Sequence, residues 1–178
     1  MRKQKGFAVW FTGLPCCGKT TIARKVAYHL KQKGYVVEHL DGDIVRKDLT
    51  SDLGFSKKDR EENLKRVTFV AKLLTRNDII VLATFVSPYK KRREQSRKEI
   101  GSFVEIYVRC PVDVCMKRDV KGMYKKALAG KIEHFTGVQD PYEEPDHPEL
   151  MLETDKESVE ESVDKVLKTL EGLGYITL

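Results

Sequence analysis

The sequence of 178 residues lacks the features that mark membrane-spanning, zinc-binding and disulfide-rich proteins. No apolar run approaches the roughly 18 residues of a membrane helix, so no membrane partner is expected. The four cysteines form no paired C-x-x-C knuckles, which argues against structural zinc and against a disulfide framework. No low-complexity tract occurs, and the basic first residues lead straight into an apolar segment. We therefore expect no signal peptide and a cytoplasmic location.

The composition that remains is that of a globular protein, with 40% hydrophobic and 34% charged residues. Short apolar segments alternate with helical patterns, which is typical of a parallel sheet covered by helices. The length and the absence of internal repeats indicate a single α/β domain over residues 1–178. Strands are expected at 7–12, 35–40, 79–84, 103–108 and 150–152, and helices at 19–33, 56–76, 89–100, from Pro111 onward, and at 158–173.

Residues 13–20, Gly-Leu-Pro-Cys-Cys-Gly-Lys-Thr, match the phosphate-loop pattern G-x-x-x-x-G-K-[ST] without a mismatch. An apolar strand precedes the match and a helical pattern follows it, which is the context that the motif needs. Backbone N–H groups and the helix N-terminus would cradle phosphates there. The alternatives are a chance octapeptide or a phosphate-binding relic without turnover. The expected ATP-binding residues are Gly13, Leu14, Pro15, Cys16, Cys17, Gly18, Lys19, Thr20 and Thr21.

Two carboxylates, Asp41 and Asp43, follow the second expected strand, where α/β sheets bind ligands. Such a pair can organise Mg²⁺ and accept a proton from an attacking hydroxyl group. We expect Thr20 and one or both of these carboxylates to hold Mg²⁺, and Lys19 to bind the phosphate oxygens. At least one of the two carboxylates is instead expected to cap the next helix.

Further on, Arg46, Arg60, Asn63 and Arg66 offer guanidinium and amide groups to an anionic acceptor. Arg60 and Asn63 lie three residues apart and so share one face of a helix, as do Asn63 and Arg66. The N-K-x-D pattern of GTPases is absent, and the chain is short for a motor or ring ATPase. These residues favour a small kinase without identifying its acceptor.

The net charge of +6 is unevenly distributed. The two basic clusters admit three interpretations, namely nucleic-acid binding, a small polyanionic substrate, or a solvated helix face. No aromatic platform accompanies them, so we expect no nucleic-acid partner. The first cluster contains Lys90, Lys91, Arg92, Arg93, Arg97 and Lys98, and the second contains Lys121, Lys125, Lys126 and Lys131.

Residues 119–148 are basic and punctuated by glycine and proline, which is typical of a lid that closes over a substrate. Because the segment looks poor in apolar anchors, we expect its first part, 119–138, to be mobile without ligand. The thiols of Cys16 and Cys17 lie near a helix N-terminus and a lysine, and such positions can depress a thiol pKa.

Beyond the phosphate loop, a series of short motifs resembles the adenylylsulfate (APS) kinase family. They cover the chain from about residue 9 to residue 154 in the order of that family, and together they are highly specific. They are Leu40–Arg46, Leu53–Ser56, Asp59-Arg60, Glu62-Asn63, Phe85–Tyr89, Cys115 with Arg118-Asp119, Lys121–Ala127, Phe135–Gly137, Asp140–Glu143 and Pro148–Leu150.

The resemblance implies a P-loop NTPase fold with a basic lid. It also implies transfer of the ATP γ-phosphoryl group to the ribose 3′-hydroxyl of APS, which gives 3′-phosphoadenylyl sulfate (PAPS) in sulfate activation. It further implies a homodimer, with ATP sulfurylase as a functional partner. Two alternatives stay open: another small P-loop kinase of an anionic metabolite, and a non-catalytic nucleotide-binding module.

The resemblance also carries roles for single residues. Asp43 corresponds to the base and Mg²⁺ organiser, with Asp41 in support. Ser87, next to Val86 in the substrate-binding set, falls where a phosphoserine intermediate is proposed, but Ser-Pro after a strand is also a turn signal and we expect direct transfer. The remaining matches are Arg46, Arg60 and Asn63 for the phosphosulfate, Phe55 and Phe135 for the APS adenine (with core packing as the alternative), Lys121 for phosphates and Arg118 for the ATP adenine.

Two departures from the family pattern stand out. Pro15, Cys16 and Cys17 replace the usual Ser, Gly and Ala of the phosphate loop, and Ile44 replaces a common Asn. A cysteine in place of glycine makes a positive φ angle less favourable at that position.

Overall fold

A computed structural model describes residues 4–177 of the chain. Its centre is a five-stranded sheet in which every neighbouring pair of strands is parallel, with the order β2-β3-β1-β4-β5. All five strands expected from the sequence are present. Their bounds are β1 Ala8–Thr12, β2 Val37–Asp41, β3 Ile80–Thr84, β4 Phe103–Arg109 and β5 Leu150–Glu153.

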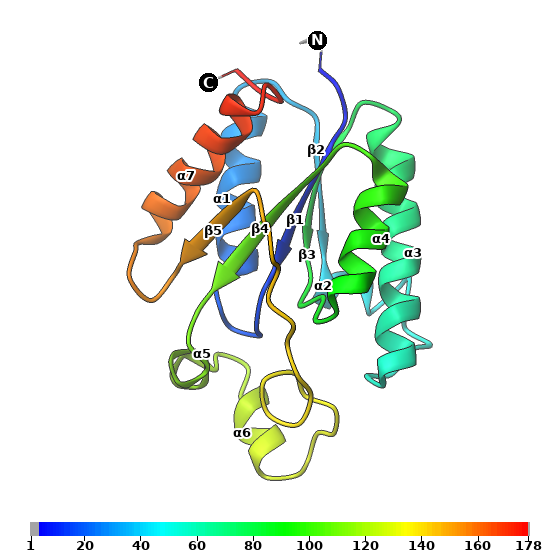
Figure 1. Ribbon diagram of the computed structural model, residues 1–178, viewed down its shortest axis with the longest axis vertical. Coiled ribbons are helices and arrows are strands. Elements are labelled where there is room, and N and C mark those ends of the chain that lie inside the picture. The colour runs from blue at the N-terminus through cyan, green and yellow to red at the C-terminus, as the bar shows by residue number, and fades with distance from the viewer. Residues whose placement is uncertain (1–3, 178) are drawn as a thin grey trace.

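Helices cover both faces of the sheet, with α1 and α7 on one side and α3 and α4 on the other (Figure 1). Three short helices, α2, α5 and α6, lie beyond the carboxyl ends of the strands. The bounds are α1 Lys19–Gln32, α2 Gly42–Val45, α3 Lys57–Thr75, α4 Lys90–Ile100, α5 Val112–Arg118, α6 Met123–Leu128 and α7 Val159–Gly172.

The alternation of side chains along β1 explains why the strand is apolar throughout. Val9 and Phe11 belong to the larger buried cluster, which includes residues of α1 and α7. Trp10 points to the opposite face and belongs to the cluster under α3, where its ring stacks between Phe85 and Phe103 at centroid distances of 5.7 and 5.6 Å. Both faces of the central strand are therefore buried, which fixes its carboxyl end, and the loop after it, in the middle of the molecule.

Helix ends follow local signals in the sequence. Ser56 caps α3 by accepting a hydrogen bond from the backbone N–H of Asp59, as expected. Ser158 and Glu161 form a complete capping box at the start of α7. Pro111 is the N-cap of α5 and not a residue of its first turn.

Helix α6 was not expected from the sequence, and α2 was expected only as the helix that Asp41 or Asp43 would cap. Helix α2 has four residues and α6 has six, which is too short for a periodic apolar pattern to stand out. Within residues 4–177, no helix combines the length and the apolar character that crossing a bilayer requires.

Candidate active site

A cavity of about 560 Å³ opens where the carboxyl ends of the central strands meet the phosphate loop. Most residues singled out from the sequence line it, although they come from segments far apart in the chain. From the phosphate loop and α1 these are Pro15, Cys16, Gly18, Lys19, Thr20 and Thr21, and from the other segments Asp41, Asp43, Arg46, Phe55, Arg60, Asn63, Val86, Ser87, Lys121 and Phe135.

Five expected residues lie outside the lining of this cavity, one of which, Arg66, is described below. Gly13 and Cys17 belong to the back of the phosphate loop, and Leu14 lines a second, smaller cavity. Arg118 donates to the backbone carbonyl of Thr154 at 2.5 Å, and the hydroxyl of Thr154 donates to the carbonyl of Cys17 at 2.8 Å. Arg118 is thus held behind the loop, beside the segment that follows β5.

The phosphate loop presents backbone N–H groups at the start of α1. The N-cap of this helix is Gly18, with φ of 104°, and no side chain caps the helix. A Cβ atom on Gly13 would lie 2.4 Å from the carbonyl oxygen of Val108, so the loop start also needs glycine. Uncapped N–H groups at a helix N-terminus form a site for phosphate.

Lys19 lies under this loop with its side chain buried. Its ammonium group donates to the carbonyl oxygens of Gly13, at 2.9 Å, and Leu14, at 2.7 Å. Both acceptors are neutral, so the full positive charge remains available to a phosphate bound above the loop.

Cys16 has a φ angle of 62°, in the left-handed region that favours glycine. The strain expected from this substitution in the loop is therefore present. Burial raises the pKa of the Cys16 thiol, and the carboxylate of Asp119 raises it further, against the weaker opposite effect of Lys19. The expectation of a depressed thiol pKa is wrong for Cys16, because desolvation outweighs the nearby lysine.

The two carboxylates of the Asp-Gly-Asp turn have different surroundings. Asp41 is the N-cap of α2 and accepts a hydrogen bond from the N–H of Asp43 at 3.0 Å. Its other oxygen accepts from the hydroxyls of Thr20, at 2.9 Å, and Thr84, at 3.3 Å. Burial alone would raise the pKa of Asp41, but these hydrogen bonds outweigh it and lower the pKa. The expected helix-capping role thus falls to Asp41.

Asp43, in contrast, projects into the cavity with most of its side chain exposed. Its carboxylate forms an ion pair with the ammonium group of Lys121, which comes from the lid. The structure therefore brings together the carboxylate and the lid lysine that the sequence had placed in one site.

The oxygen atoms around Thr20 fit a magnesium ion held jointly with phosphates. The Thr20 hydroxyl and the Asp41 carboxylate are in contact, and Asp43 lies two residues further on. Mg²⁺ usually takes one or two carboxylates and completes its shell with substrate phosphates and water. Among residues 4–177, no group of three or more His, Cys, Asp or Glu side chains is arranged to hold a metal ion.

Phe55 forms a wall of the cavity and is flanked by two arginines. The guanidinium of Arg46 lies 4.3 Å from the ring centroid and that of Arg60 lies 5.7 Å from it. The side chain is 46% exposed, so core packing does not account for Phe55. Burial lowers the pKa of both arginines, although both stay far above neutrality and remain charged.

Asn63 lines the same cavity from α3, one turn after Arg60, so their predicted common face is confirmed. It is buried and accepts a hydrogen bond from the hydroxyl of Thr50 at 2.7 Å. Arg66 does not line the cavity. Its guanidinium forms a two-point pair with Asp52, at 2.7 and 2.9 Å, so the expectation that it serves the acceptor is not met.

Ser87 lies on the loop between β3 and α4 and is 2% exposed. Its hydroxyl accepts a hydrogen bond from the indole N–H of Trp10 at 2.9 Å, inside the core under α3. The backbone of Ser87 is held at a φ angle of 46°, which is unusual for a residue other than glycine. In this structure the hydroxyl is therefore engaged by the core.

The lid is better anchored than its sequence suggested. Tyr124, Ala127 and Phe135 are buried and belong to the larger core cluster. The rings of Tyr124 and Phe135 pack edge to face at 4.9 Å, and the Tyr124 hydroxyl donates to the carbonyl of Pro15. The expectation of few apolar anchors is therefore wrong for these three positions, while Val120 remains 89% exposed.

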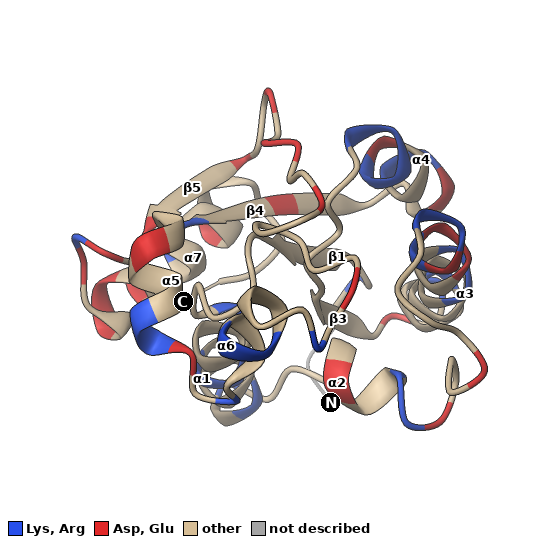
Figure 2. Ribbon diagram, turned by 90° about the horizontal axis from the view of Figure 1, so that it is seen from below, with Lys and Arg blue, Asp and Glu red and all other residues tan. Residues whose placement is uncertain are grey.

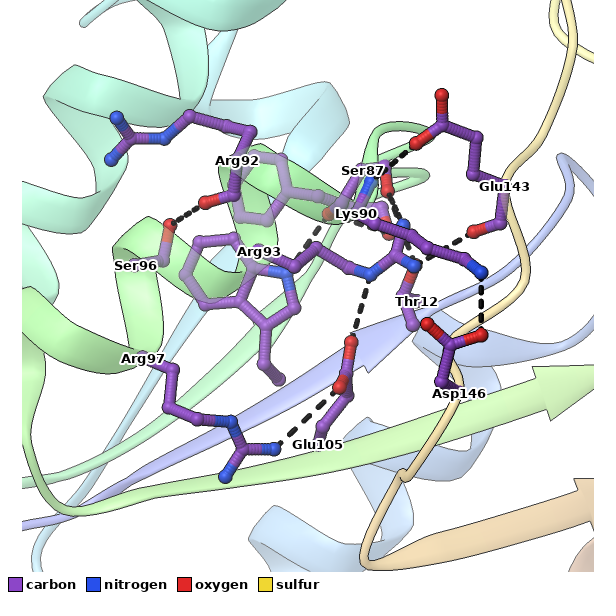
Figure 3. A network of polar contacts seen from close by, with 12 residues as sticks. Thr12, Ser87, Lys90, Arg92, Arg93, Ser96, Arg97, Glu105, Glu143 and Asp146 are labelled. Atoms are coloured by element: carbon purple, nitrogen blue, oxygen red, sulfur yellow. Dashed lines mark hydrogen bonds and ion pairs between the residues drawn. The ribbon is translucent and has the colours of Figure 1, made fainter.

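The first basic cluster is mostly neutralised within the protein. Acidic residues lie beside the basic ones on α3 and α4 (Figure 2), and Figure 3 shows the ion pairs of Lys90 with Asp146 and of Arg93 and Arg97 with Glu105. Arg92 and Arg93 are buried, so a solvated helix face is the wrong interpretation for them. The ion pairs are Lys90 with Asp146, Arg92 with Glu99, Arg93 with Glu105, and Arg97 with Glu105 and Glu149.

Sequence reasoning missed several groups that hold the site together. Thr84, at the end of β3, contacts Asp41. Tyr142, from the last part of the lid segment, has its hydroxyl 2.9 Å from that of Thr12, which directly precedes the phosphate loop. In each pair the two residues lie more than 40 positions apart in the chain, so no local pattern reveals the contact. The one signal in the sequence is that Thr12 and Thr84 each stand at the end of an expected strand.

Comparison with known proteins places this site in a family. The family model described as "Adenylylsulphate kinase" matches residues 5–153. An adenylyl-sulfate kinase of Halothermothrix orenii is 61% identical over 178 residues, covering 100% of this chain and 96% of that protein. One from Picosynechococcus is 54% identical over 175 residues, covering 98% and 99%.

A solved structure gives the same result. The APS kinase of Mycobacterium tuberculosis, in complex with AMPPNP and APS, superposes with a TM-score of 0.91 at 42% identity. The match covers 95% of this chain and 99% of that one. The likeness thus extends through the sheet, the phosphate loop and the lid.

Because burial raises the pKa of Cys16, we expect its thiol to react slowly with iodoacetamide near neutral pH. Mass spectrometry that follows each cysteine separately should show slower labelling of Cys16 than of a free cysteine peptide at pH 7.5, with the rate still rising above pH 9. A Cys16→Ser variant controls for the other thiols. Labelling of Cys16 faster than the peptide at neutral pH would contradict the raised pKa.

Proposed function

The chain belongs to the adenylylsulphate kinase family, and from this premise we propose that it transfers the γ-phosphoryl group of ATP to the ribose 3′-hydroxyl of APS. The products are ADP and PAPS. The observation that carries the proposal is the single cavity that joins the phosphate loop to Asp43 and to the Phe55 wall. A phosphate donor and an aromatic, anionic acceptor can meet in it.

We assign the ATP phosphates to the loop 13–20 and to Lys19. The uncapped N–H groups at the start of α1 and the buried ammonium group converge on one side of the cavity. They are placed to stabilise the negative charge that spreads over the γ-phosphoryl oxygens in a loose transition state. Arg118, beside the segment after β5, is the proposed contact for the ATP adenine.

We assign the acceptor to the opposite wall. Phe55 and Phe135 offer aromatic surface to the APS adenine. Arg46, Arg60 and Asn63 supply two positive charges and an amide for the phosphosulfate group. Both arginines are partly buried, so their charge is less screened by water than that of surface lysines.

The proposed chemistry is a direct transfer. The ribose 3′-oxygen attacks the γ-phosphorus, the bond to the bridging oxygen of ADP breaks, and the proton of the hydroxyl passes to Asp43. Asp43 suits this role because Thr20 of α1 and Thr84 of β3 donate their hydrogen bonds to Asp41. The carboxylate of Asp43 is therefore not needed to hold these segments together. Mg²⁺, held by Thr20 and the Asp41–Asp43 turn, supplies charge neutralisation at the phosphates when it is bound.

Several finer assignments accompany this function. We propose one kinase domain over residues 1–178, with the lid at about 119–148, acting in the cytoplasm. The family resemblance favours a homodimer and a functional link to ATP sulfurylase, which supplies APS by its chemistry. Exposed apolar side chains such as Phe69 on α3 are compatible with a second copy of the chain packing there.

The function is tested with a coupled assay for ADP release. We expect turnover with ATP, Mg²⁺ and APS, and PAPS as the second product by chromatography. A sugar acid and nucleoside monophosphates are the comparison acceptors, because other small P-loop kinases use such substrates. Equal or faster turnover with one of these acceptors would contradict the proposal, and ATP binding without turnover on any acceptor would favour a non-catalytic module.

The roles of Asp43 and Ser87 are separated by alanine variants. Asp43→Ala should lower kcat by about 10²-fold or more, as expected for the loss of a general base. Ser87→Ala should lower kcat by less than about tenfold, roughly 1.4 kcal/mol, because its hydroxyl contacts Trp10. The exposed Asp48→Ala is the matched control and should leave kcat unchanged. A phosphoenzyme that forms and decays at the turnover rate and is absent in Ser87→Ala would overturn the direct mechanism.

The lid is tested by hydrogen exchange with and without ADP plus APS. We expect new protection at about 119–123 and 129–134, because Lys121 must leave Asp43 for phosphate and Val120 must become covered. The buried anchors Tyr124 and Phe135 should change less. Peptides from α7 serve as the internal control, and unchanged exchange throughout 119–138 would refute a closing lid.

A further inference from the structure

The loop Phe85–Tyr89, which follows β3, contains one residue in an unfavourable backbone conformation. Ser87 has a φ angle of 46°, in the left-handed region that is unfavourable for a residue with a side chain. Val86, Ser87 and Pro88 line the cavity beside Asp43. A strained segment in the wall of a site persists only when surrounding groups hold it, so the contacts of Ser87 identify those groups.

The carbonyl of Ser87 is held by Arg93, a residue of α4 whose side chain is 3% exposed. Three N–H groups of this guanidinium donate to three different segments (Figure 3). Nη1 donates to the Ser87 carbonyl at 2.5 Å, Nε to the carboxylate of Glu105 on β4 at 2.8 Å, and Nη2 to the carbonyl of Glu143 at 2.7 Å. A planar guanidinium can satisfy three acceptors at once, whereas a lysine ammonium at the same position cannot reach the same points.

Glu143 belongs to the segment by which the chain leaves the lid, and it is fastened to the same loop. Its N–H donates to the carbonyl of Pro88 at 2.9 Å, and its carboxylate accepts from the N–H of Lys90 at 2.8 Å. The end of the lid segment therefore lies against the loop after β3 and the start of α4.

The preceding residue, Tyr142, connects this segment to the phosphate loop. The hydroxyl of Thr12 donates to the carbonyl of Val86 at 2.8 Å, so the Tyr142 hydroxyl is the donor in its contact with Thr12. Thr12 directly precedes Gly13. The start of the phosphate loop, the loop after β3 and the exit of the lid thus meet around one buried arginine.

We propose that Arg93 is a positioning residue for the acceptor. It acts through the Ser87 carbonyl, which sets the Val86–Pro88 wall, and through Glu143, which ties the lid to that wall. Its charge is balanced by Glu105, which also receives Arg97 at 3.5 Å. The identity of the acceptor as APS rests on the function proposed above, whereas the placement of the loop by Arg93 does not.

The test compares Arg93→Lys with Arg92→Lys. Arg92 is a matched control because it is the adjacent buried arginine of α4, 8% exposed, and it faces α3 through the hydroxyl of Thr68 at 3.1 Å. Both variants should lower Tm. Only Arg93→Lys should raise the KM for APS, by at least about tenfold, while the Kd for ATP stays within about twofold of the unaltered protein.

A spectroscopic readout tests the placement without any substrate. Trp10 is the single tryptophan of the chain, and its indole N–H donates to the Ser87 hydroxyl. Release of the Ser87 loop should shift the emission maximum of the ligand-free protein in Arg93→Lys and not in Arg92→Lys. If the unaltered protein binds ATP but does not phosphorylate APS, the proposed function fails. The emission of Trp10 still tests whether Arg93 positions the Ser87 loop, because it needs no substrate.

The outcomes separate positioning from mere stability. An equal rise of the KM for APS in both variants would overturn the proposal, and so would unchanged KM and Trp10 emission in Arg93→Lys. If Arg93→Lys does not fold, Tyr142→Phe decides, since it removes only the hydroxyl that joins the lid exit to Thr12. A rise of about threefold in the KM for APS supports the proposal, and no change in that KM overturns it.

Discussion

The carboxylate of Asp41 joins the start of α1, the end of β3 and the turn that carries Asp43, at the centre of the site. It accepts hydrogen bonds from Thr20 at the start of α1, from Thr84 at the end of β3, and from the backbone of Asp43. A buried carboxylate is stable only when its oxygens are satisfied, and here four lone-pair directions meet three donors. Because the oxygens of Asp41 are occupied by these hydrogen bonds, its role is structural. Asp43 is the carboxylate whose side chain is exposed in the cavity.

The positive charge of the chain is less available than its total suggests. A guanidinium in the interior needs charged or carbonyl partners, since the cost of removing it from water exceeds the gain from an imperfect pair. Arg92, Arg93 and Arg97 find such partners on α4, β4 and the segment before β5. The basic helix α4 is therefore part of the scaffold. Within the residues that the structure describes, the cations that line the cavity come from segments other than α4. They include Lys19, Arg46, Arg60 and Lys121.

The lid combines a fixed end with exposed parts. Tyr124 and Phe135 pack in the core. Tyr142 fastens the exit of the lid to the end of β1, and Glu143 fastens it to the loop after β3 and to α4. Between these anchors, residues such as Val120 and Lys121 remain exposed. The exposed part of the lid thus lies between two anchored parts, and the anchors tie the acceptor wall to the strand that leads into the phosphate loop.

Local signals in the sequence were enough for the sheet and the phosphate loop. All five strands lie where apolar segments predicted them. Gly13 and Gly18 of the phosphate loop have positive φ angles, and a Cβ atom on Gly13 would also collide with the neighbouring strand β4. The common face of Arg60 and Asn63 follows from helical spacing alone. The family resemblance then placed Phe55 and Phe135 in one cavity, which periodicity could not do.

Tertiary structure alone decided which polar groups are free and which are used. Ser87 meets Trp10 across 77 residues, and Asp41 meets Thr84 across 43, so no local pattern reveals either pair. Arg93 and Lys91 look alike in the sequence, yet only Arg93 is turned inward, because the packing of α4 on β4 brings Glu105 within reach. The sequence by itself determined where the chemistry-bearing residues stand along the strands. The packing of helices on the sheet decided their partners, because burial and hydrogen bonding depend on neighbours that are distant in the chain.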